Sequence, residues 1–245
     1  MTSEDVALPT ETVPERVLVI AAHPDDIDFG AAGTVATLTA KGATVAYCIV
    51  TDGDAGGFDR GIDRAEMPRI RRAEQTRAAE LVGVHELTFL GYPDGRVLAD
   101  LQLRTDLSRA IRQFRPDRVL CPSPERDYAR LPASHPDHLA TGEAALCAIY
   151  PDARNPFAFP ELLAEGHEPH VVSEIWVMAS KDQNIFVDIT DTIGQKLAAL
   201  AAHESQLPKP DETLAFVREW CASTAERAGF APGRYAESFL KADAW

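Results

Sequence analysis

Residues 21–30, "AAHPDDIDFG", place a histidine and three acids close together, directly after the apolar run "RVLVI" (16–20). These residue types suit two structures. They fit a solvated turn that caps a helix, because Asp is a common N-cap and Pro is ordinary at the first helical position. They also fit half of a metal site. Taken alone, the stretch does not decide between the two.

A second tetrapeptide favours the metal site. "SHPDH" (134–138) repeats the pattern of histidine, proline, aspartate and then a side chain able to bind metal. His23 and Asp26 from the first loop and His138 from the second can converge on one ion. Two nitrogens and a carboxylate leave a fourth position open for water, as in catalytic zinc sites. A Zn²⁺ ion would also offset the repulsion among the clustered acids.

Apolar runs and helical patterns alternate along the chain, which predicts an α/β fold. The expected strands are residues 16–22, 44–51, 86–91, 117–123, 173–180 and 184–190, and the expected helices are 31–42, 67–83, 101–114, 138–150, 193–206 and 213–229. We expect a Rossmann-like, doubly wound, mostly parallel sheet with helices on both faces. Ligands bind such sheets beyond the carboxyl ends of the strands, so the active site should lie there, at His23. Acids rather than a glycine-rich loop at this point argue against a nucleotide.

Composition and charge limit the domain organisation, the partners and the localisation that we expect. Residues 1–15 resemble a flexible tail, and residues 16–245 are expected to form a single domain. A net charge of −14 argues against nucleic acid and anionic membrane surfaces as partners. The absence of a long apolar run and the acidic start "MTSEDVALPTETVPE" predict a cytoplasmic protein without a membrane span. A homo-oligomer is compatible with this composition, which does not decide the oligomeric state.

Together the motifs resemble the zinc-dependent N-deacetylases of the LmbE/PIG-L type. The resemblance runs from about residue 16 to about 206 and is carried by the stretches "AAHPDD", "TDGDAGG" (51–57), "RRAEQTRAAELVGV" (71–84), "SHPDH" and "HESQ" (203–206). It implies zinc ligands at His23, Asp26 and His138. The paired HPDD and HPDH motifs are its specific part.

The resemblance also implies roles for the neighbouring residues. Asp25 becomes the general base that takes a proton from water and later passes it to the leaving amine. His135, in its protonated form, supports the oxyanion, and Arg71 or Arg72 contacts the substrate. Asp54, in "TDGDAGG", is expected to line the pocket. Some members carry an oxyanion-assisting tyrosine where this chain has Ala133, and whether Tyr128 replaces it stays open.

By the same resemblance, the substrate is a small-molecule amino-sugar conjugate that loses an N-acetyl group. Two alternatives remain. An amidase that removes a larger acyl group, such as a cysteine conjugate, would use the same ligands and base. A non-catalytic, metal-dependent sugar-binding protein would gain nothing from Asp25, an acid beside the metal that does not bind it. The exact substrate, the pathway and the choice between zinc and another divalent ion are beyond the sequence.

Overall fold

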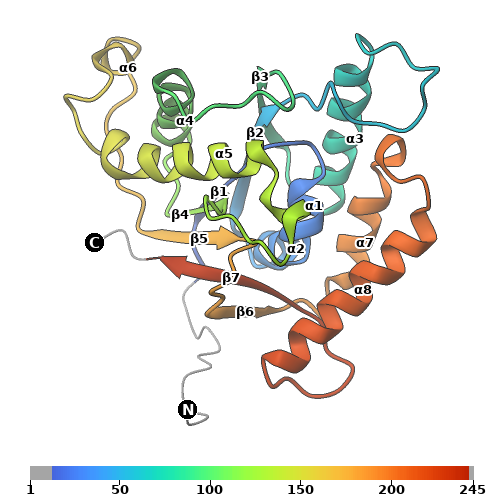
Figure 1. Ribbon diagram of the computed structural model, residues 1–245. Coiled ribbons are helices and arrows are strands. Elements are labelled where there is room, and N and C mark those ends of the chain that lie inside the picture. The colour runs from blue at the N-terminus through green and yellow to red at the C-terminus, as the bar shows by residue number, and fades with distance from the viewer. Residues whose placement is uncertain (1–12, 243–245) are drawn as a thin grey trace.

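A computed structural model of the protein describes residues 13–242 (Figure 1). The expected tail, residues 1–15, therefore lies mostly outside the described residues. Seven strands form one sheet in the order β3-β2-β1-β4-β5-β7-β6. Their bounds are β1 Arg16–Ala21, β2 Thr44–Thr51, β3 Glu86–Tyr92, β4 Arg118–Pro122, β5 Glu174–Met178, β6 Ile185–Asp188 and β7 Ala236–Ala242.

The sheet is parallel from β3 to β5 and antiparallel where β7 inserts between β5 and β6. β1 and β4 lie side by side although β2 and β3 come between them in the chain. The direction of strand addition therefore reverses between β1 and β4. In doubly wound sheets a ligand crevice opens at this reversal. The predicted fold class is confirmed, and the structure identifies the two loops that border the crevice.

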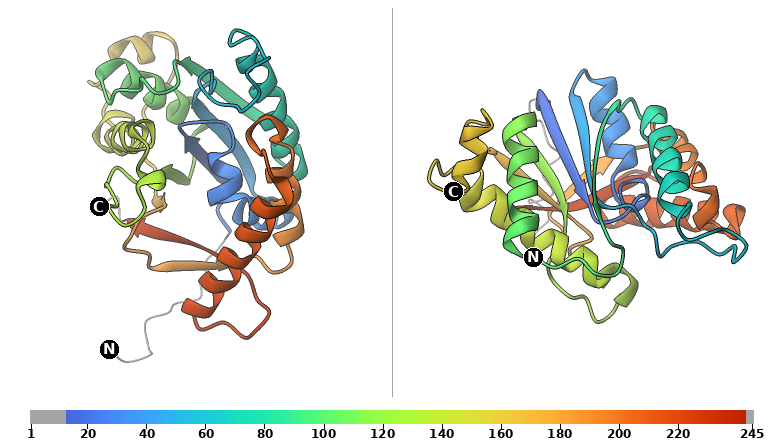
Figure 2. Two further views of the ribbon diagram at one scale, coloured as in Figure 1. Left: turned by 45° about the vertical axis from the view of Figure 1, so that its right-hand side comes forward. Right: turned by 90° about the horizontal axis from the view of Figure 1, so that it is seen from above.

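Helices cover both faces of the sheet (Figure 2). α4 and α5 pack on one face, while α2, α3 and α7 cover the other. The helices are α1 Asp26–Gly30, α2 Ala32–Ala40, α3 Met67–Leu81, α4 Leu101–Phe114, α5 Pro136–Cys147, α6 Pro160–Ala164, α7 Ile193–Ala201 and α8 Pro210–Arg227. Short turns of helix are η1 Leu131–Ser134, η2 Ala148–Asp152 and η3 Glu204–Gln206. The described residues include no helix long and apolar enough to cross a membrane.

Several elements differ from the sequence prediction. β7 and the short helices α1 and α6 were not predicted, and the helix expected over 193–206 ends at Ala201. β7 has a mixed sequence, "AESFLKA", whose place in the sheet depends on pairing with β5 and β6 rather than on its own pattern. α5 begins at Pro136 instead of residue 138, because the His135 ring caps it by accepting the backbone N–H of Asp137.

A buried ion pair ties β7 to the helices beside the crevice. Lys196 Nζ on α7 lies 2.7 Å from Glu237 Oε1 on β7, and the two side chains are 0% and 3% exposed. The same carboxylate accepts the backbone N–H groups of Gly33 and Thr34, which have no partner of their own at the start of α2. Lys196 also donates to the carbonyl oxygens of Asp28 and Phe29 in α1. This pair thus anchors the helix that follows His23.

We predict that Lys196→Met destabilises the fold by about 3–5 kcal/mol, because it leaves the Glu237 carboxylate buried without its cation. Lys209→Met is the matched control, since Lys209 and its partner Glu212 are 68% and 70% exposed. Such an exposed pair contributes at most about 1 kcal/mol. Urea unfolding of the two variants measures the difference, and equal losses would show that the Lys196 pair is not an anchor.

Candidate active site

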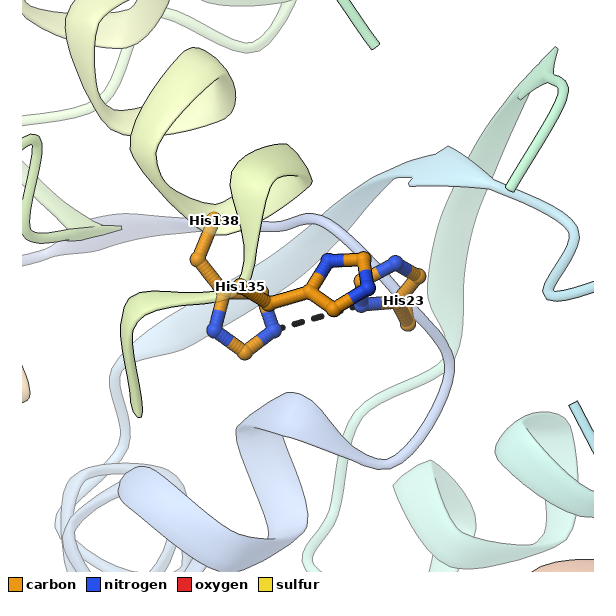
Figure 3. A group of neighbouring side chains, drawn as sticks. All are labelled: His23, His135 and His138. Atoms are coloured by element: carbon orange, nitrogen blue, oxygen red, sulfur yellow. Dashed lines mark hydrogen bonds between the residues drawn. The ribbon is translucent and has the colours of Figure 1, made fainter. Parts of the chain in front are cut away.

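The loops that follow β1 and β4 bring three histidine rings together at the crevice (Figure 3). His23 follows β1 by two residues, whereas His135 and His138 lie at the start of α5, which packs beside β4. The ring centroids are 4.8–5.5 Å apart. The two HPD tetrapeptides, separated by more than 100 residues in the chain, therefore meet in space as predicted.

His23, Asp26 and His138 have the spacing of ligands around one ion. His23 Nδ1 lies 3.2 Å from His138 Nε2 and 3.5 Å from Asp26 Oδ2, and His138 Nε2 lies 3.0 Å from Asp26 Oδ1. Tetrahedral ligands at about 2.0–2.1 Å from zinc are about 3.3 Å from one another. The pairwise distances between these three side chains are therefore close to those of ligands around an ion of this size.

The remaining ring nitrogens of the two histidines also fit this assignment. His23 Nε2 lies 3.2 Å from Asp137 Oδ2 and 3.3 Å from Asp94 Oδ1, and His138 Nδ1 faces the Ala133 carbonyl oxygen at 3.5 Å. A metal-binding histidine commonly donates its other N–H to such an acceptor, which fixes the tautomer. With its proton on Nε2, His23 donates to Asp94 and Asp137, and these two carboxylates orient the ring.

His135 also lies close enough to be considered as a ligand, since one nitrogen from each of the three histidines falls within 4.8 Å of the others. Its hydrogen bonding argues otherwise. His135 Nδ1 accepts the backbone N–H of Asp137 at 3.2 Å, so the neutral ring carries its proton on Nε2. Burial, together with the charge on His23, lowers the pKa of His135 and keeps the ring neutral. Its free N–H suits it to donate a hydrogen bond.

The carboxylates around His23 stabilise its positively charged form when no metal is bound. Burial disfavours a charged His23, but Asp26, Asp137 and Asp94 outweigh it and raise the pKa of His23 to about 12. Burial likewise disfavours ionised Asp26, and the His138 and His23 rings overcome this and hold its pKa well below the usual value. The site therefore binds a proton where a metal cation would supply the same compensation.

Asp25 is next to the predicted ligand Asp26 in the chain, but its carboxylate is not one of the three predicted ligands. Its backbone has a φ of 93°, a conformation that residues other than glycine rarely adopt. The Gln75 side chain holds it there by accepting the Asp25 backbone N–H at 2.8 Å. Burial, with help from the charge of Asp26 and against the charge of Arg71, raises the Asp25 pKa to about 6. A base with this pKa can be ionised near neutral pH and still accept a proton.

Arg71 lies beneath the Asp25 loop, with only 4% of its side chain exposed. Its guanidinium donates to the Pro24 and Gly53 carbonyl oxygens and to Asp25 Oδ2 at 3.1 Å. A Cβ at Gly53 would lie 2.2 Å from Arg71 Nη1, and one at Gly56 would lie 2.5 Å from it. The glycines of "TDGDAGG" therefore leave the space that the Arg71 guanidinium fills.

The other two residues expected to bind substrate also have partners within the protein. Arg72 forms a two-point ion pair with Asp52 and lies over the Phe89 ring. Asp54 pairs with Arg64 and accepts the Asp94 backbone N–H at 2.8 Å. Tyr128 is 84% exposed and does not line the cavity beside Asp26 and His138.

Several supporting residues escaped the sequence analysis. Asp94 follows β3, and Asp137 lies inside the second tetrapeptide, where it accepts the backbone N–H groups of Gly95 and Val97. The signal for Asp94 was its place at the carboxyl end of a third parallel strand.

A second group of supporting residues lies below the first loop. The Gln75 side chain bonds to Asp25 and also donates to the Asp28 carboxylate. Asp28 pairs with His203 at 2.8 Å, and the side chains of Asp28 and His203 are fully buried. His203, from "HESQ", supports the first loop.

Known proteins resemble this chain in sequence and structure. The family model described as "PIG-L: GlcNAc-PI de-N-acetylase" matches residues 18–149. A diacetylchitobiose deacetylase from Thermococcus kodakarensis is 34% identical over 195 residues, which cover 80% of this chain and 71% of that protein. A Bacillus anthracis protein named "Probable N-acetyl-alpha-D-glucosaminyl L-malate deacetylase 2" is 30% identical over 203 residues, covering 78% of this chain and 81% of its own.

The solved structure of N,N'-diacetylchitobiose deacetylase from Pyrococcus horikoshii, in complex with an inhibitor, has the same architecture. It matches with a TM-score of 0.86 and 33% identity, covering 94% of this chain and 84% of its own. The matched family segment contains both HPD tetrapeptides and the strands that position them. From its motifs, its fold and these matches, the chain belongs to the PIG-L family, the LmbE/PIG-L type that its sequence resembles.

Proposed function

We propose that the protein is a zinc-dependent amidohydrolase that removes the N-acetyl group from an N-acetylglucosamine-type sugar or glycoconjugate. One observation carries the proposal: His23, Asp26 and His138 approach one another in pairs at 3.0–3.5 Å, through both oxygens of Asp26, and next to them lies the carboxylate of Asp25, which is not one of the three. The two relatives named for deacetylation of glucosamine conjugates support the substrate class. Two imidazoles and a carboxylate are typical ligands of catalytic zinc.

The site residues have different roles in breaking the amide bond. His23, Asp26 and His138 would hold zinc, which when bound polarises the acyl carbonyl and makes water nucleophilic near neutral pH. Asp25 takes the proton of that water and delivers it to the nitrogen as the C–N bond breaks. His135 donates its Nε2–H to the carbonyl oxygen as negative charge develops there. Water thus supplies oxygen to the carboxylic acid and hydrogen to the free amine.

Arg71 acts in this proposal as a positioning residue rather than a substrate contact. Its guanidinium is nearly fully buried and is already bonded to the Asp25 carboxylate and to the carbonyl before it. It therefore holds the base in its strained conformation while its charge favours the ionised form of Asp25. Asp54 is likewise a positioning residue, because its carboxylate accepts the backbone N–H of Asp94.

The ligand assignment predicts different metal contents for two variants with the same substitution. His138→Gln should lose most of its zinc after dialysis, because it removes a ligand. His135→Gln should keep about one zinc per chain yet lose roughly 10²–10³-fold in kcat, the usual cost of one oxyanion donor. Elemental analysis and amine release measure the two effects. Equal loss of zinc in both variants would mean that His135 is a ligand.

Asp25→Asn should retain zinc and lose about 10²–10⁴-fold in turnover of an N-acetylglucosamine glycoside, because the amide side chain cannot accept a proton. In the unmodified protein kcat/KM should fall as pH drops through about 6 or lower, since the base must be ionised and a bound cation lowers its pKa further. Asp182→Asn, in an exposed turn, is the control. An Asp25→Asn variant with half of the normal turnover would remove Asp25 from the mechanism.

Arg71→Ala should reduce kcat/KM equally on N-acetylglucosamine and on larger glucosaminyl conjugates, by roughly tenfold or more, because the loss arises at Asp25. A buried charged hydrogen bond of this kind contributes about 1.5–3 kcal/mol. Steady-state kinetics on both substrates, with Arg72→Ala for comparison, make the measurement. A loss confined to the larger conjugates would instead show that Arg71 contacts the substrate beyond the sugar.

Gly53→Ala tests the same packing without removing a polar group. A left-handed φ of 63° and the overlap with the Arg71 guanidinium both oppose a Cβ at this position. Gly233→Ala has a similar φ of 84° with no atom within 4 Å, so it reports the backbone cost alone. We expect Gly53→Ala to cost about 1–3 kcal/mol more in unfolding free energy than Gly233→Ala, the usual range for overpacking. Equal costs would indicate that Arg71 moves aside freely.

A further inference from the structure

A cavity of about 340 Å³ opens directly beside two of the predicted metal ligands. Asp26 and His138 form one end of it. The rest of its wall is mostly apolar, with large side chains from Phe29, Met178, Phe216 and Trp220. This volume is at the lower end of the range of about 300–1,000 Å³ for small-molecule sites.

The wall that α8 contributes is not needed to pack that helix. Val217 and Cys221 are buried in the cluster that joins α8 to α7, so they attach the helix to the domain. Phe216 and Trp220 are four residues apart and hence share a different side of the helix. Phe216 is 64% exposed, and the Arg130 guanidinium lies 5.3 Å from the centre of the Trp220 ring. Two aromatic rings thus face the cavity without serving the core.

The position of the cavity limits what can fill it. In the proposed function the scissile carbonyl would lie at the metal that Asp26 and His138 would hold, so the cavity beside these two residues is open to an adjoining part of the same substrate. Sugar hydroxyls there would lose hydrogen bonds to water and find few partners on the wall. An alkyl or aryl group would instead bury apolar surface against Phe216 and Trp220.

We propose that this cavity binds an apolar substituent of the amino-sugar substrate, an inference that rests on the proposed function and extends it. A glucosamine unit can carry such a substituent in two places. One is an acyl chain longer than acetyl on the nitrogen, and the other is an alkyl or aryl aglycone at the anomeric carbon. Both present the same chemistry to the wall. Substrates that carry one of them should be preferred over N-acetylglucosamine itself.

Two series of substrates test the proposal on the zinc-loaded, full-length protein. One lengthens the N-acyl chain of methyl glucosaminide from acetyl to octanoyl. The other keeps the acetyl group and lengthens the alkyl aglycone from methyl to octyl. In one of the two series kcat/KM should rise about fourfold per added methylene until the cavity is filled. Phe216→Ala and Trp220→Ala should each lower kcat/KM on the longest substrates of that series by roughly tenfold or more. Phe157 is an exposed aromatic residue on the loop before α6, and Phe157→Ala should leave kcat/KM unchanged.

Binding of the two products gives a readout that does not need turnover. Calorimetry with alkyl glucosaminides and with short carboxylic acids should show the same dependence on chain length and on Phe216 as the productive series. Hydrolysis of N-acetylglucosamine glycosides with no dependence on length in either series, or in product binding, would overturn the cavity proposal alone. Length-dependent binding without hydrolysis of any substrate would support the cavity and overturn the proposed function. Neither binding nor hydrolysis would overturn both.

Discussion

The imidazole of His23 has carboxylates at both of its nitrogen atoms, and the rest of the site depends on how this negative charge is compensated. Asp26 lies on the Nδ1 side, and Asp94 and Asp137 lie on the Nε2 side. Such a group of acids, none of them more than 17% exposed, is stable only with a cation among them. In the metal-free protein a proton on His23 fills that role. Because zinc would fill it with a larger charge, the same crowding that costs stability without metal favours metal binding.

This charge distribution comes from separate parts of the chain that only the fold brings together. β1 and β4 border the strand-order reversal and deliver the two HPD loops, and the turn after β3 brings Asp94 to the far side of the His23 ring. α3 lies below and fixes Asp25 through Gln75 and Arg71. The base is therefore held by contacts from a helix that supplies no metal ligand. These contacts hold its strained backbone, whereas burial of the carboxylate raises its pKa against the charge of Arg71.

The parts of the site that the sequence predicted are those whose signals are local. His23, Asp26 and His138 each lie in a tetrapeptide at the carboxyl end of a strand, so the two tetrapeptides were enough to predict that these side chains meet. The unusual φ of Asp25 was not predictable, because it depends on Gln75, fifty residues away in the chain. The burial of Arg71 depends on missing side chains in the glycine loop. β7 was missed for a similar reason, since its strand conformation depends on partners in the sheet.

Proton release on zinc binding tests this account most directly. At pH 7 His23, with its pKa raised to about 12, carries a proton in the metal-free protein and must lose it to bind the metal through Nδ1. Calorimetric titration of zinc into the metal-free protein in two buffers of different ionisation enthalpy counts the protons released. We expect at least about one proton per zinc, with affinity that rises with pH. Zinc binding without proton release would contradict the assignment of His23 as the central ligand.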